Sequence, residues 1–175
     1  NIGTQSVYLA LSKNFKKVIA IEPDIFNFKL LRKNINDNNL SNIITPYNIA
    51  IGESNNLMTL FEDKNNRGAH SLISSNNHQK GYSVEVKDLA TFIYDFNINI
   101  DDIGFVWIDI EGMEPDVLNT FTKTFNKLPF IYTEYSPNLY NEKNDNNYSS
   151  PRLDILSLIN DKHKKSEVIN DIELF

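Results

Sequence analysis

Two carboxylates stand close together in the segment Asp109-Ile110-Glu111, directly after the apolar run Phe105–Ile108. A buried charge is costly unless it is paired or used, and in open α/β sheets ligands bind outside the carboxyl ends of the strands. We therefore expect Asp109 to lie on the floor of an active site. Side-chain alternation along a strand would place Glu111 on the same face. Alternatively, Glu111 caps the backbone of the turn at Gly112.

A second set of residues suits a nucleotide. Gly3 precedes a helical pattern, where a glycine lets a ligand approach the helix N-terminus. Glu22 follows the next apolar run, at a place where acidic residues bind ribose hydroxyls. Gly3 is also compatible with a plain turn, and Glu22 with a solvated strand end or a helix-cap partner. A dinucleotide fingerprint needs G-x-G-x-x-G. With Gly3 as its second glycine, Ser6 would stand where the last glycine or alanine is needed, which disfavours NAD as the cofactor.

Other candidates are weaker. Glu134 is expected near the end of a neighbouring strand, and with Asp109 and Glu111 it would offer oxygen ligands to a divalent metal. We keep this as an alternative and predict no metal. His70 lies in a polar loop over residues 63–81 and is an alternative base or a substrate contact, whereas His78 is expected to be an ordinary surface histidine.

The composition narrows the class of protein. A length of 175 residues predicts one domain, and a net charge of −6 argues against nucleic acid. The absence of cysteine excludes disulfides, zinc–thiolate sites and a cysteine nucleophile, and it fits the cytoplasm. No apolar run approaches the ~20 residues that cross a bilayer. Because the chain starts at Asn1 rather than Met, we expect a segment whose N-terminus lies upstream.

The periodicity of apolar residues predicts alternating strands and helices. Such alternation implies an α/β fold with a doubly wound, mostly parallel sheet covered on both faces, and with a small β insertion over residues 54–88. Asp24 is the expected N-cap of the second helix, and Pro115 suits the first turn of another. The predicted helices cover residues 4–13, 24–39, 89–96, 115–125 and 153–159, and the predicted strands cover 18–21, 43–49, 57–61, 82–86, 104–110, 128–135 and 168–175.

Four motifs together resemble the FkbM-type methyltransferases, which are class I enzymes that use S-adenosylmethionine and are mostly O-methyltransferases. The motifs are Asn1-Ile2-Gly3, VIAIEP at 18–23, NIAIGE at 48–53 and WIDIEGME at 107–114. The resemblance runs to about Pro137 and implies a Rossmann-like sheet. In that family a strand ending in aspartate and a Gly-Ala pair precede Asn-Ile-Gly. We therefore expect the first strand to lie upstream and the segment alone to bind the cofactor poorly.

The resemblance also assigns roles to residues. Asn1, Ile2 and Gly3 would line the methionine end of S-adenosylmethionine, Glu22 would bind the ribose, Pro23 would shape the turn beside the adenine, and Asn48, Ile49 and Ala50 would contact the adenine. Asp109 and Glu111 would face the methyl-transfer site. Asp109 is the first candidate for the base that takes the acceptor's proton, Glu111 the second, and His70 the alternative.

The acceptor implied by the resemblance is a hydroxyl of a sugar, glycolipid or secondary metabolite. The expected partner is thus a small-molecule or glycan acceptor, with no nucleic acid and no membrane span. Two alternatives remain open from the residues alone. One is an NAD-type oxidoreductase on a related sheet, and the other is a non-catalytic binding module with the same fold.

Overall fold

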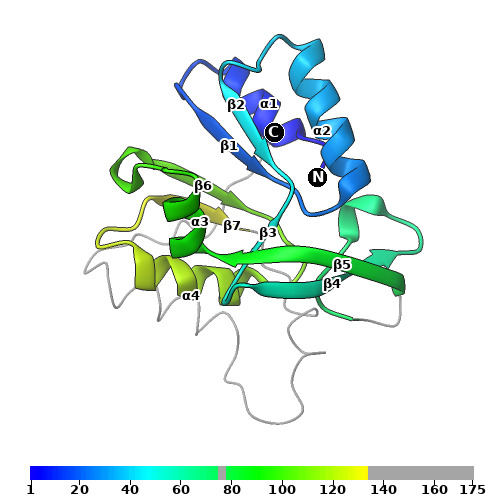
Figure 1. Ribbon diagram of the computed structural model, residues 1–175. Helices are drawn as coiled ribbons and strands as arrows, with labels where there is room; N and C mark the ends of the chain where they lie inside the picture. The colour runs from blue at the N-terminus through cyan, green and yellow to red at the C-terminus, as the bar shows by residue number, and fades with distance from the viewer. Residues whose placement is uncertain (75–77, 134–175) are drawn as a thin grey trace, which may run out of the picture.

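The computed structural model describes residues 1–74 and 78–133, which form both strands and helices (Figure 1). The helices are α1 (Thr4–Leu11), α2 (Ile25–Asp37), α3 (Leu89–Asp95) and α4 (Glu114–Thr124), with short 3-10 turns η1 (Arg67–Ala69) and η2 (Ile100–Asp102). The strands are β1 (Val18–Ile21), β2 (Ile44–Tyr47), β3 (Ala50–Gly52), β4 (Asn56–Asp63), β5 (His78–Asp88), β6 (Phe105–Ile108) and β7 (Phe130–Thr133).

The strands form three small sheets within the described residues. β1 pairs with β2, β6 pairs with β7, and β5 lies between β3 and β4. The pairs β1–β2, β3–β5 and β6–β7 are parallel, whereas β4 and β5 form an antiparallel pair. The predicted mixed α/β fold with parallel strands is therefore confirmed. The predicted single doubly wound sheet is not seen as such.

The first core joins α1 and α2 to the β1–β2 pair (Figure 1). Ala20 points from β1 toward the helices and packs with Leu31 and Ile35 of α2, which lie on one helical face. Ile19 and Ile21, on the opposite face of β1, are partly exposed. Asp24 caps α2 as predicted, because its side chain accepts the Asn27 backbone N–H.

The second core lies between α3, α4 and the strands β3 and β6. Phe92 of α3 packs with Val117, Leu118 and Phe121 of α4 against Ile108 of β6. The predicted helix over 89–96 and the predicted early proline of α4 are both confirmed. This core positions the end of β6, where the two candidate carboxylates were expected.

Contacts between aromatic rings connect the two cores. The Tyr47 ring of β2 meets the Phe92 ring with centroids 5.3 Å apart, and it meets the Phe96 ring at 4.2 Å. Phe15, which follows α1, contacts Phe105 at the start of β6, with centroids 5.8 Å apart. These rings therefore hold β2 against α3, and the chain after α1 against the start of β6.

Several strand predictions were wrong in their bounds. β4 and β5 are longer than the strands expected over 57–61 and 82–86, and β5 starts at His78, inside the polar loop expected over 63–81. The strand expected over 43–49 ends at Tyr47, and β3 then starts at Ala50 in a different sheet, because Ala50–Gly52 pair with the end of β5. The strand expected over 104–110 is confined to Phe105–Ile108. Leu128 packs in the core ahead of β7, which starts at Phe130 and not at residue 128 as predicted.

Several predictions fall outside the described residues. Glu134, the helix over 153–159 and the strand over 168–175 belong to this group. Within the described part of the chain, no helix is long and apolar enough to cross a membrane.

Candidate functional site

The loop after β1 is organised around the Glu22 carboxylate. Glu22 is only 6% exposed, and its Oε1 accepts the Asp24 backbone N–H at 2.7 Å. The backbone nitrogen of Asn1 contacts the other carboxylate oxygen. Asn48 supports the same loop from the next connection, because its Nδ2 donates to the carbonyls of Glu22 and Pro23 at 2.8 and 3.0 Å. The loop is therefore held in shape by the residues that were predicted to bind the cofactor.

Gly3 is required by the backbone where α1 begins. It is the N-cap of α1 with φ of 91°, in the left-handed region, and a Cβ there would lie 2.4 Å from the Leu31 Cδ1 atom. The Ile2 carbonyl accepts a hydrogen bond from Asn34 Nδ2 at 2.9 Å, which fixes the entry to the helix. Only glycine fits this position, and it brings the backbone close to α2.

The Asp24 carboxylate makes several contacts in the site, although the sequence indicated only a helix cap. It is 1% exposed. Its Oδ1 accepts the Asn27 N–H, and its Oδ2 lies 3.2 Å from His70 Nδ1 and accepts the Tyr82 hydroxyl at 2.5 Å. Burial favours the neutral acid, but the hydrogen bonds from Tyr82 and Asn27 and the His70 charge outweigh it and lower the pKa of Asp24. Asp24 is thus an ionised, buried acceptor.

The hydrogen bond between Asp24 and Tyr82 has the opposite effect on the pKa of Tyr82. Burial and the hydrogen bond to Asp24 raise the pKa of the Tyr82 phenol above its usual range. Because Asp24 is ionised, His70 carries a proton on Nδ1 and donates it to the Asp24 carboxylate. When the imidazole ring is neutral, Nε2 is therefore its hydrogen-bond acceptor. The His70 side chain is 7% exposed, so Asp24 fixes its orientation.

The end of β6 forms a tight turn. Asp109 directly follows the strand and is exposed, whereas Glu111 is half-buried. Glu111 and Gly112 have φ values of 53° and 100°, so the chain reverses through two left-handed residues. The expectation that Glu111 shares a face with Asp109 assumed strand alternation, which does not apply here because β6 has already ended at Ile108.

A buried carboxylate from α4 closes this turn. Glu114 is 3% exposed, and it accepts the Ile110 N–H at 3.0 Å and the Gly112 N–H at 2.9 Å. The backbone-capping role considered for Glu111 is therefore performed by Glu114. A carboxylate that satisfies two backbone donors makes charge-assisted hydrogen bonds, which fix the turn more firmly than neutral ones.

One segment of the β4–β5 connection joins the two loops. Ser71 pairs with Phe61 through two backbone hydrogen bonds, which anchors the segment to β4. His70 then reaches the Asp24 carboxylate, and Ser71 Oγ donates to the Glu111 carbonyl at 2.8 Å. The loop after β1 and the turn after β6 are therefore bridged by consecutive residues.

The electrostatics of Asn1 agree with this proximity. The backbone nitrogen of Asn1 lies beside the Glu22 carboxylate, and the charges of Asp24 and Asp109 are close enough to act on it. The structure thus brings Asn1, Glu22, Asp24 and Asp109 into one neighbourhood.

Some predicted residues take other positions. Ile49 is buried in the second core and Ala50 is buried in β3, so a ligand contact there would involve backbone atoms. Across residues 1–74 and 78–133, no group of three His, Cys, Asp or Glu side chains could hold a metal ion. The alternative metal site with Glu134 lies beyond these residues.

The sequence did not predict three features of the site: the contacts of Asp24 with His70 and Tyr82, the Tyr82 hydroxyl and the Glu114 carboxylate. Tyr82 and His70 are 58 and 46 residues from Asp24, so no local pattern connects them. Glu114 did carry a signal, since it lies two residues after Gly112 in the motif over 107–114 and starts a helix.

Known proteins that resemble this chain belong to one family. The model of the methyltransferase FkbM domain family matches residues 1–165. The chain also matches the crystal structure of methyltransferase FkbM from Methylobacillus flagellatus KT, with a TM-score of 0.56 and 20% sequence identity. That match covers 93% of this chain and 35% of the other, and it shows a shared fold. None of the curated proteins matches the chain. Because the family model covers most of its length, the chain belongs to the methyltransferase FkbM domain family.

Proposed function

We propose that this protein is an S-adenosylmethionine-dependent methyltransferase with a Rossmann-like sheet, and that it methylates a hydroxyl oxygen of a small molecule or glycan. The observation that supports this most is the pair of acidic loops at the carboxyl ends of β1 and β6, joined by His70 and Ser71, in a member of the FkbM family. Ligands of α/β folds bind at such strand ends.

The residues of the first loop fit the cofactor. A carboxylate has about four acceptor sites, and Glu22 uses one oxygen for Asp24 N and the other for Asn1 N. It therefore has capacity left for the two hydroxyls of a ribose. Gly3 brings the start of α1 to the same place with no side chain in the way. Asn1 and Ile2 would flank the methionine end, and Pro23 with Asn48, Ile49 and Ala50 would border the adenine.

The second loop supplies the acceptor side. S-adenosylmethionine, when bound, supplies a methyl group on a positively charged sulfur. The acceptor hydroxyl must lose its proton as the new bond forms, and a carboxylate is a suitable base. Asp109 is exposed at the end of β6, so its carboxylate is accessible to an acceptor. His70 is the alternative base, because Asp24 orients its ring.

The cofactor assignment is tested in the whole protein with Glu22→Gln, which keeps the shape and removes the charge. Charge-assisted hydrogen bonds contribute about 1.5–3 kcal/mol, so S-adenosylmethionine should bind the variant at least about tenfold more weakly by calorimetry. Glu85→Gln is the matched control, since Glu85 is half exposed on β5. Unchanged affinity in a folded Glu22→Gln protein would remove Glu22 from the site.

The base is tested with Asp109→Asn in the whole protein. Loss of a general base lowers the rate by about 10²–10⁴, whereas cofactor affinity should stay within a few-fold. Product analysis with labelled cofactor shows whether oxygen receives the methyl group. Glu111→Gln should cost less, because Glu111 is the second candidate and lies in the turn, three residues beyond the end of β6. If Asp109→Asn turns over normally, His70 becomes the candidate base; if cofactor binding is lost, Asp109 belongs to the cofactor site.

A further inference from the structure

The two nitrogens of the His70 ring have different surroundings. Nδ1 lies 3.2 Å from Asp24 Oδ2, and only 7% of the side chain is exposed. Among the residues that the structure describes, the ring has no second hydrogen-bond partner. In the same part of the chain, no buried side-chain nitrogen or oxygen lacks a partner. Nε2 therefore reaches the surface of the molecule through a narrow opening.

The Asp24 carboxylate is fixed in the orientation that faces His70. Its Oδ1 accepts the Asn27 backbone N–H at 2.6 Å and so caps α2, while its Oδ2 accepts the Tyr82 hydroxyl at 2.5 Å. The carboxylate cannot turn away from the ring without breaking the helix cap. Because the hydrogen bond made by one ring nitrogen decides which nitrogen carries the proton, this geometry keeps the proton on Nδ1.

His70 lies between the two loops of the proposed site. Asp24 follows Glu22 by two residues, and Glu22 Oε1 accepts the Asp24 N–H at 2.7 Å. The next residue after His70, Ser71, donates through Oγ to the Glu111 carbonyl at 2.8 Å. A ligand that spans the two loops would therefore lie beside the segment that carries His70.

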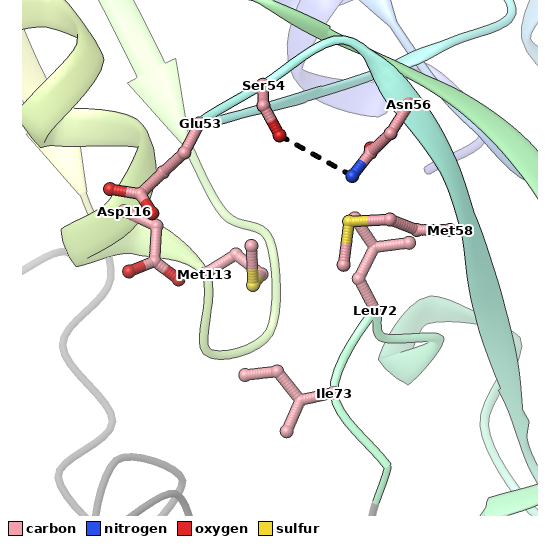
Figure 2. Close-up of a pocket in the computed structure, with 8 residues that line it drawn as sticks. All are labelled: Glu53, Ser54, Asn56, Met58, Leu72, Ile73, Met113 and Asp116. Carbon is pink, nitrogen blue, oxygen red and sulfur yellow. Dashed lines mark hydrogen bonds between the residues drawn. The ribbon is translucent and has the colours of Figure 1, made fainter.

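The same segment borders a hollow of about 390 Å³. Leu72 and Ile73 line it together with Met58 of β4 and Met113 at the start of α4. Figure 2 shows these four side chains extending toward a common space. The volume is near the lower end of the range of about 300–1,000 Å³ that is typical of small-molecule sites. A small molecule therefore has room beside this segment.

We propose that His70 binds a hydroxyl group of the ligand through Nε2, and that Asp24 is the positioning residue that presents this nitrogen as a hydrogen-bond acceptor. This inference rests on the proposed methyltransferase function, in which the cofactor ribose and the methyl acceptor both carry hydroxyls. The unprotonated nitrogen of a neutral imidazole accepts an O–H, whereas the opposite tautomer would present an N–H at the same place.

The tautomer is measured by NMR on the whole protein with isotope-labelled histidine, and His70→Gln identifies the signals of His70. The spectra are recorded at about pH 9, well above the ordinary pKa of histidine. Because a hydrogen bond to a charged acceptor is the stronger kind, the Nδ1–H form of His70 should exceed the Nε2–H form at least about tenfold. An Nε2–H form as the main species would overturn the proposal.

The positioning role is tested with Asp24→Asn. Asparagine is also a good N-cap, so its amide oxygen should keep the Asn27 N–H and the helix. The amide NH₂ then faces His70, and the ring proton should move from Nδ1 to Nε2. A proton that stays on Nδ1 in the folded variant would refute the positioning role.

Two controls separate this role from support of the fold. Asp88→Asn is the matched control, since Asp88 caps α3 by accepting the Thr91 N–H, and it should leave the His70 tautomer unchanged. Tyr82→Phe removes a hydrogen bond to the same Asp24 oxygen but keeps the charge, so the Nδ1–H form should persist. Loss of the Nδ1–H form in both controls would also refute the role of Asp24.

The bound hydroxyl is tested with S-adenosylhomocysteine, which has no methyl group to transfer, and with hexyl β-D-glucopyranoside, galactopyranoside and mannopyranoside. At least one probe should shift the Nε2 signal of His70, and by calorimetry that probe should bind Asp24→Asn at least about tenfold more weakly than Asp88→Asn. A shift with S-adenosylhomocysteine alone identifies the ribose as the source of the hydroxyl, whereas a shift that requires a glycoside identifies the acceptor. No shift with any probe would overturn the hydroxyl assignment.

Calorimetry of S-adenosylhomocysteine with the wild type tests the proposed function separately. A protein whose His70 responds to a glycoside but which has no affinity for S-adenosylhomocysteine would contradict the methyltransferase function, and leave His70 as a hydroxyl-binding residue. A protein that binds S-adenosylhomocysteine while no probe changes the His70 signals would contradict this inference alone. The two failures are therefore distinguishable.

Discussion

Glu114→Gln removes the charge that holds the turn after β6 while leaving the size of the side chain unchanged. The carboxylate accepts two backbone N–H groups, and glutamine has one acceptor oxygen and a donor in place of the second. One buried N–H therefore faces a donor. A hydrogen bond to a charged group contributes about 1.5–3 kcal/mol, so we expect the free energy of unfolding to fall by about 2–3 kcal/mol.

The assay is denaturant unfolding followed by the fluorescence of Trp107, the only tryptophan in the chain. Trp107 lies in β6, and its ring centroid is 4.3 Å from that of Tyr132, so its emission reports on the strand that leads into the turn. The matched control is Asp116→Asn, since Asp116 is also a carboxylate in the first turn of α4. Loss of a charge at a helix N-terminus costs only about 0.3–1 kcal/mol. The reasoning would be refuted if Glu114→Gln destabilised the protein no more than Asp116→Asn.

Two further predictions concern the loop after β1. Gly3→Ala should lower the free energy of unfolding by about 2–4 kcal/mol, because the backbone is left-handed there and the added Cβ would clash with Leu31. The control is Gly104→Ala, where an added Cβ meets nothing within 4 Å. Equal losses of stability in the two variants would contradict the argument. Tyr82→Phe should remove a stabilisation that depends on pH. The raised pKa of Tyr82 means that its contribution is complete below about pH 10 and is lost as the pH rises through the folded-state value. The lowered pKa of Asp24 means that its contribution is present above about pH 4 and is lost as the pH falls through the folded-state value. Melts across this range should show the wild type's advantage over Tyr82→Phe shrinking above pH 10, and a constant difference would contradict the contact.

Local patterns predicted the elements that depend on local interactions. β1 and the cap of α2 followed from an apolar run and from Asp24, whose partner Asn27 is three residues away. The proline at the start of α4 is equally local. These signals are contained within one helical turn or one strand, so a single sequence is enough to find them.

The parts of the site that depend on distant residues could not be predicted from one sequence. The division of the strand expected over 43–49 coincides with Asn48, whose side chain is used by the loop after β1, 25 and 26 residues away. The end of β6 is set by Glu114 and by a left-handed Glu111, a conformation that non-glycine residues adopt rarely. The contacts of Asp24 with His70 and Tyr82 arise only when the β4–β5 hairpin folds against α2.

The segment from His70 to Ile73 has a consequence for the order in which ligands would act. Its first residue, His70, holds the loop after β1, and its second, Ser71, holds the turn after β6. Its last two, Leu72 and Ile73, line a hollow together with Met58 and Met113. A ligand that displaces this segment at one of the two loops would change the hydrogen bonds that the segment makes to the other loop. By thermodynamic reciprocity, two ligands that both act on this segment alter each other's affinity by the same factor. Cofactor and acceptor would thus be energetically coupled through four consecutive residues, without touching the same side chain.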